Sequence, residues 1–174
     1  MPAIEDTPEP DSPAHGVPLF LEEAAWLYQT DQTCPEDLPM IAAQALAVGV
    51  DTPALCELAG LPRHADPRDI RDTFEHALSE LGIALPDSSL AQRYALRRLA
   101  TRFTVGQTTL AELASDEWSD IEVETAEEQA FLALLPPCAC CTAYTLGLEE
   151  TAWEAQLRIA ARVLASHPTV GPGV

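Results

Sequence analysis

Apolar side chains recur every three or four residues along most of the chain, which is the pattern of helices that bury one face. The first such stripe follows Pro18 and consists of Phe20, Ala24 and Leu27. The stripe nearest the C-terminus consists of Trp153, Leu157, Ala160 and Leu164. No segment alternates apolar and polar residues with period two while also being rich in β-branched residues, so the sequence predicts no sheet.

Capping residues divide this pattern into about seven or eight helices. The expected starts after the first helix are Asp37, Asp51, Asp66, Asp87 or Ser88, Thr109, and Thr125 with Glu128 as a capping box. The expected ends are Gly49, Gly60, Gly82, Gly106 and Pro136-Pro137. The sequence therefore predicts an all-α protein: a single domain of about seven or eight helices in an irregular orthogonal bundle, with no sheet.

Both ends of the chain differ in composition from this helical region. Residues 1–18 contain five prolines and four acidic residues and no aromatic side chain, which predicts a disordered acidic Pro-rich tail. Residues 168–174 contain two prolines and two glycines and predict a flexible C-terminal tail. The helical domain is expected to span residues 19–167.

The stretch from about Met40 to Ala165 resembles uncharacterised small helical proteins of actinobacteria. Three segments carry the resemblance: Ala45-Leu46-Ala47-Val48-Gly49, Leu55-Cys56-Glu57-Leu58-Ala59-Gly60-Leu61 and Ala77-Leu78-Ser79-Glu80-Leu81-Gly82. An arginine-bearing helix, a glycine and an acidic segment with a tryptophan follow them. The resemblance implies a helical fold and transfers no activity and no site.

The chain is strongly acidic, with a formal net charge of −19, and all nine of its basic residues are arginines. Residues 1–62 and 103–157 each carry −11, whereas residues 63–102 carry +1. A field of this sign repels nucleic acid and anionic membranes and attracts cationic partners. We therefore expect a basic protein as partner, with no nucleic acid and no membrane.

Eight carboxylates fall between Glu112 and Glu128 and favour a docking surface for that partner or, more simply, a solvated acidic loop. The candidate partner-binding residues are Asp116, Glu117, Trp118, Asp120, Glu122 and Glu124. Trp26 and Tyr28 beside Glu22 are further candidates, although tryptophans more often anchor helix packing. A calcium loop is excluded because Trp118 and Ile121 stand where a ligand and a glycine are required.

Four arginines lie on one expected helix: Arg93, Arg97, Arg98 and Arg102. They form its polar face, and the acidic flanks favour internal ion pairing over phosphate binding. The segment 51–81 resembles a helix-turn-helix, but its second helix carries Asp66, Asp69, Asp72 and Glu75, which would face a DNA groove badly.

Cys138, Cys140 and Cys141 could share a zinc ion or form a redox pair, which is the alternative to incidental packing. A structural zinc site needs four ligands, and the sequence holds no second C-x-x-C motif, so no cofactor is expected. Cys34, Cys56, His76 or His167 could complete a site only if the fold brought them close.

Catalytic motifs are missing: none of the four histidines is near a serine or cysteine in a recognisable nucleophile setting, and no Gly-rich phosphate loop follows a strand. No apolar run is long enough to span a membrane and no secretory signal is seen, so we expect a cytoplasmic protein. The prediction is a non-enzymatic acidic interaction protein, for example an inhibitor or immunity-type binder of a basic protein such as a nuclease toxin. The alternatives are a metal- or thiol-dependent protein using the Cys138–Cys141 cluster, or a small-molecule enzyme or binder with a pocket between helices.

Overall fold

The structure is a computed structural model that describes residues 18–62, 64–114, 118, 120–136, 147, 149–167 and 171–172. Within these residues the regular elements are all helices and no strand occurs, which confirms the predicted all-α class. The elements are α1 (Leu19–Tyr28), the 3-10 helix η1 (Pro35–Asp37), α2 (Leu38–Ala47), α3 (Pro53–Gly60), α4 (Pro67–Glu80), α5 (Ser88–Thr104), α6 (Leu110–Leu113), α7 (Ala126–Leu132) and α9 (Glu150–Ser166). Apart from Pro18, Gly171 and Pro172, the two predicted tails lie outside the described residues.

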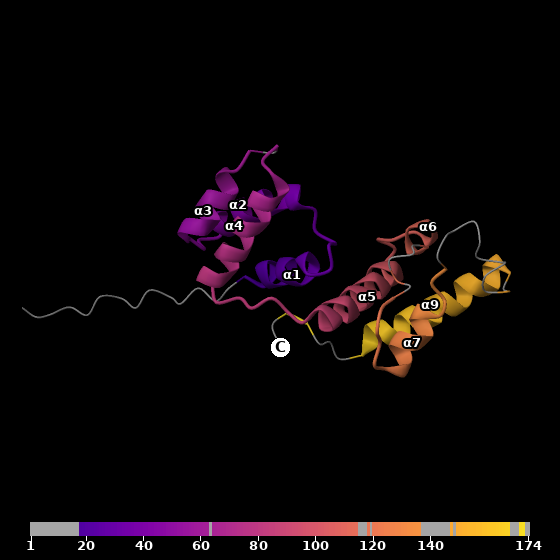
Figure 1. Cartoon of the computed structure of the whole chain (residues 1–174). Helices are drawn as coiled ribbons and strands as arrows, with labels where there is room; N and C mark the ends of the chain where they lie inside the picture. Colours follow the sequence, from indigo (N-terminus) through magenta and orange to yellow (C-terminus); the bar gives the residue numbers. More distant parts are fainter. Residues whose placement is uncertain are drawn as a thin grey trace, which may run out of the picture.

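The helices enclose two apolar cores that lie next to each other. The first core is built by α1 to α4 around fully buried side chains such as Leu21, Leu58 and Phe74. The second is built by α5, α6, α7 and α9 around Leu96 and Phe131. Figure 1 shows α2, α3 and α4 gathered on one side and α5, α7 and α9 on the other. We call residues 18–83 the first lobe and residues 84–167 the second lobe.

Helices α1 and α5 join the two lobes. The Nε of Arg98 on α5 donates a hydrogen bond to Glu23 on α1 over 2.7 Å. One turn away from each, the rings of Trp26 and Tyr94 meet edge to face with their centroids 5.3 Å apart. An ion pair and an aromatic contact therefore fix how α1 lies against α5.

Most of the predicted helix boundaries are confirmed, because the capping side chains form the expected hydrogen bonds. Asp66 and Asp87 each accept from the backbone N–H two residues later, at 2.9 Å. Thr109 and Thr125 each form a capping box with the glutamate three residues on. These bonds satisfy N–H groups that have no partner inside the helix.

Two boundaries differ from the prediction. The N-cap of α3 is Thr52, whose hydroxyl accepts from the backbone of Leu55, and not Asp51, which accepts from the Cys56 thiol instead. Helix α7 ends at Leu132 rather than reaching Leu135. The second difference follows from Pro136, since a residue that precedes proline is disfavoured in the helical conformation.

Candidate functional site

A buried ion-pair cluster joins α5 to α7 in the second lobe. Arg93 and Arg97 lie one turn apart on α5, each 7% exposed, and face Glu128, which is 0% exposed. The Glu128 carboxylate accepts from Arg93 Nε at 3.0 Å and from Arg97 Nη2 at 2.8 Å. Arg93 also donates from Nη1 to Glu124 over 2.6 Å. Two buried arginines are thus bound to the buried Glu128, and one of them also binds Glu124 at the surface.

The capping box of α7 completes this cluster. One Glu128 oxygen accepts from the backbone N–H groups of Glu124 and Thr125, at 3.1 and 3.2 Å. Burial raises the pKa of Glu128, but the hydrogen bonds from Arg93, Arg97 and these two N–H groups outweigh it and lower the pKa to about 2. The cluster therefore stays charged at neutral pH and has a structural role.

The arginines of α5 therefore act mainly within the protein, as the acidic flanks of the sequence predict. Arg93, Arg97 and Arg98 all bind carboxylates of the chain. Arg102 is different: its Nη2 donates a long hydrogen bond to the carbonyl of Gln107 over 3.5 Å, and no carboxylate of the described residues lies within ion-pair distance of it. Arg102 is therefore the arginine of α5 without a carboxylate partner among the described residues.

The six candidate partner-binding residues are not alike in the structure. Asp116 and Glu117 lie outside the described residues. Glu124 is bound by Arg93, and Trp118 is only 6% exposed, packed in the second core. Asp120 and Glu122 are exposed and have no arginine partner among the described residues. Of the six candidates, only Asp120 and Glu122 are therefore described as exposed carboxylates without an arginine partner. Trp118 packs in the core and is not available as an exposed aromatic residue for a protein partner.

The other aromatic candidates are also engaged in packing. Trp26 contacts Tyr94, and the ring of Tyr28 meets that of Phe74 edge to face at 5.1 Å. The Tyr28 hydroxyl donates to Glu75 over 2.6 Å, and burial together with this carboxylate raises the pKa of Tyr28 well above its ordinary value. Trp153, which the spacing of the last helix assigns to packing, is buried and donates from Nε1 to the carbonyl of Leu134 over 2.8 Å.

The largest excess of exposed carboxylates lies on the first lobe, which carries a formal charge of −9. Eight of its exposed carboxylates have neither an arginine nor a histidine partner among the described residues: Glu36, Asp37, Asp51, Glu57, Asp66, Asp69, Asp72 and Glu75. We call these eight residues the first-lobe acidic surface. The sequence carries a signal for this surface, since Asp66, Asp69, Asp72 and Glu75 lie within one predicted helix, but the denser acidic run at residues 112–128 favours the other segment as the binding site.

The predicted metal or thiol cluster cannot be placed, because Cys138, Cys140 and Cys141 lie outside the described residues. Cys34 and Cys56 are exposed free thiols. His76 pairs with Glu80 at 3.8 Å, and His167 pairs with Glu127 at 3.4 Å. In the described part of the chain, no three His, Cys, Asp or Glu side chains are grouped to hold a metal ion.

None of the described helices combines the length and apolar character that crossing a membrane requires. The chain matches no family model, no curated protein and no solved structure. The fold and the charge define its class: an acidic, all-α protein with a formal charge of −9 on the first lobe and −6 on the second.

Proposed function

We propose that the protein is a non-enzymatic interaction protein that binds a basic protein partner through its first-lobe acidic surface. An inhibitor or immunity-type binder of a cationic enzyme is the concrete form of this proposal. The observation that supports it is the unequal use of arginine. The second lobe binds several of its carboxylates to arginines, whereas eight exposed carboxylates of the first lobe have neither an arginine nor a histidine partner in the described part of the chain.

The exposed carboxylates of the first lobe favour the binding of a cationic partner for electrostatic reasons. Like charges close together on a surface repel one another, and a cationic partner removes that repulsion when it binds. Asp69 and Asp72 stand three residues apart on α4, where neighbouring side chains lie on the same side of the helix. A surface with an excess of one sign of charge can also raise the rate of association by about 10- to 1000-fold at low salt.

The same lobe supplies apolar contact area. Met40 and Val48 on and next to α2 are 56% and 59% exposed. Charged groups alone give mainly rate and specificity, whereas apolar side chains that become buried supply much of the affinity of a protein interface. The lobe thus offers both kinds of group that such an interface uses.

The test is salt-dependent binding with located charge reversal. The immobilised protein is exposed to an extract of its source cells at about 50 mM NaCl, where surface electrostatics is only weakly screened, and bound proteins are eluted at about 500 mM. The captured basic protein is then purified and titrated by calorimetry against the wild type and two variants. Asp69→Lys with Asp72→Lys alters the proposed surface, and Asp120→Lys with Glu122→Lys makes the same change in net charge elsewhere.

Both variants lose the same long-range attraction, but only the α4 variant loses the proposed direct contacts with the partner. The α4 variant should therefore bind at least about tenfold more weakly than the Asp120/Glu122 variant. Circular dichroism confirms that both variants are folded. Equal losses would show that only net charge matters, and a larger loss at Asp120 and Glu122 would assign binding to the other segment. If no basic protein is retained at low salt, the proposed function is wrong.

A further inference from the structure

A cleft of about 700 Å³ lies where the two lobes meet. Its walls come from the turn after α1 (residues 29–32), one face of α5, and the later residues Thr108, Glu112, Trp118 and Ile121. Along α5 it extends from Ser88 to Arg102, which corresponds to about 20 Å at the rise of an α-helix. This volume falls within the range of small-molecule binding sites.

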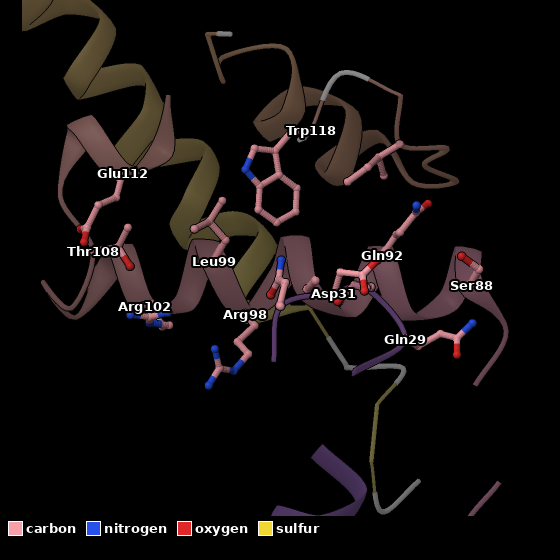
Figure 2. A pocket seen from close by; sticks show the side chains of 14 residues that line it. Gln29, Asp31, Ser88, Gln92, Arg98, Leu99, Arg102, Thr108, Glu112 and Trp118 are labelled. Carbon is pink, nitrogen blue, oxygen red and sulfur yellow. The ribbon is translucent and has the colours of Figure 1, made fainter. Parts of the chain in front are cut away.

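One side of the cleft is apolar. Trp118, Leu99 and Ile121 line it, and Figure 2 shows the Trp118 indole standing over α5 beside Leu99. Trp118 is held in the second core, so its position is set by packing before any ligand arrives. A fixed indole next to an aliphatic side chain is a suitable surface for an apolar or aromatic group.

The opposite side carries positive charge. Arg98 and Arg102, one turn apart on α5, both line the cleft, and Figure 2 shows them projecting from the side of α5 away from the indole. Arg98 is bound to Glu23. Glu112, which also lines the cleft, is bound in its capping box by the backbone N–H and the hydroxyl of Thr109, at 2.7 and 2.9 Å. The charge of Arg102 is therefore the one that no described carboxylate pairs.

A buried hydroxyl adds an independent observation. Thr108 lines the cleft and is 7% exposed, yet its Oγ1 has no hydrogen-bond partner, the single buried side-chain polar atom of the described residues in this condition. Figure 2 shows Thr108 at the end of the cleft where Arg102 lies. Buried polar groups of folded proteins are nearly always paired, so a buried donor beside a cleft indicates a partner that comes from outside the chain.

We infer that the cleft binds a small organic carboxylate, with its carboxylate group at Arg102 and Thr108 and its apolar or aromatic body against Trp118 and Leu99. A guanidinium and a hydroxyl are donors that match carboxylate oxygens. The net charge of −19 penalises each further negative charge, which favours a monoanion over a phosphate dianion. This inference does not depend on the proposed protein partner, because the cleft and the first-lobe acidic surface use different residues.

The experiment is a titration of the full-length protein with defined probes, followed by calorimetry and by tryptophan fluorescence. Acetate, 3-phenylpropionate and indole-3-propionate test the contribution of the apolar body. 3-Phenylpropionamide tests the charge, and inorganic phosphate tests for a bare anion site. We expect 3-phenylpropionate or indole-3-propionate to bind with a dissociation constant of about 1 mM or lower, and acetate, phosphate and the amide to bind at least about tenfold more weakly.

Two variants test the anchoring groups. Arg102→Gln should weaken the aromatic carboxylates about tenfold and leave the weak binding of the amide unchanged. Arg162→Gln on α9, an exposed arginine outside the cleft, is the matched control and should leave every affinity unchanged. Thr108→Val should lower carboxylate affinity several-fold without lowering the melting temperature of the free protein, because the wild-type hydroxyl has no partner to lose.

Several results would overturn the inference. Lack of saturable binding by any of the three carboxylates would do so, as would equal affinities for 3-phenylpropionate and its amide. Unchanged affinity in Arg102→Gln would remove the assigned anion position. A destabilised Thr108→Val protein would show that the hydroxyl already has a partner in the free protein, which would remove its assigned role.

Discussion

Replacement of Glu128 by glutamine tests whether the buried cluster between α5 and α7 stabilises the fold. The substitution keeps the side-chain length, and glutamine can also occupy the third position of a capping box. It removes only the negative charge that Arg93 and Arg97 share. The variant therefore separates the ion pair from the helix cap.

The pKa of Glu128 gives the size of the effect. Its fall from 4.5 to about 2 corresponds to no more than about 3 kcal/mol of stability at pH 7, at about 1.4 kcal/mol per pH unit. Because the pKa in the folded state lies below the ordinary value, this stabilisation is complete above pH 4.5 and is lost as the pH falls through about 2. The Glu128→Gln variant should be about 3 kcal/mol less stable at pH 7 and differ by less than half as much at pH 3.

Urea unfolding followed by circular dichroism at pH 7 and pH 3 measures both differences. Glu112→Gln is a matched control, since Glu112 holds the same position in the capping box of α6 but is exposed and contacts no buried arginine. It should change stability by less than about 1 kcal/mol. The reasoning is refuted if Glu128→Gln costs no more than Glu112→Gln, or if its cost does not depend on pH.

Two further substitutions test the backbone and the core. Gly106→Ala should destabilise the protein by about 1 kcal/mol, because Gly106 has a φ of +75° that alanine rarely adopts. Gly60→Ala at the end of α3 should instead stabilise it by up to about 1 kcal/mol. A Cβ meets nothing within 4 Å at either site, so thermal unfolding should show a lower melting temperature for Gly106→Ala and a higher one for Gly60→Ala. Leu96→Ala, at a fully buried site, should lower the free energy of unfolding in urea by about 2–5 kcal/mol. Ile159→Ala, at a site that is 61% exposed, should lower it by less than about 1 kcal/mol. Similar losses of stability in the two variants would contradict the division of the second lobe into core and surface.

Local signals made the helices predictable. An aspartate or threonine followed by an apolar stripe predicts a helix start from short-range bonding alone, and Asp66, Asp87, Thr109 and Thr125 all serve as N-caps. The division into two cores was not predictable in the same way. Every stripe requires burial, but spacing along one helix does not say which other helix covers it.

The site was harder to predict because it depends on distant partners. Glu128 reads as an ordinary capping glutamate, yet its carboxylate also binds arginines 35 and 31 residues earlier. The sequence therefore suggests more free negative charge in residues 112–128 than the structure has, since Glu124 and Glu128 are bound by arginines. Thr108 and the cleft gave no signal at all, because a cleft arises from how α1, α5 and the following segment meet.

The position of α5 explains how its arginines are used. This helix packs Leu96 and Ala100 into the second core, binds α7 through Arg93 and Arg97, and binds α1 through Arg98. A helix that meets neighbours on several sides needs long side chains that can reach carboxylates on each of them, and arginine provides several donors for this purpose. Three of the four arginines of α5 are bound to carboxylates in this way. Arg102 lies beyond the contacts with α1 and α7 and has no carboxylate of the described residues within ion-pair distance, which is why the inferred ligand site is placed beside it.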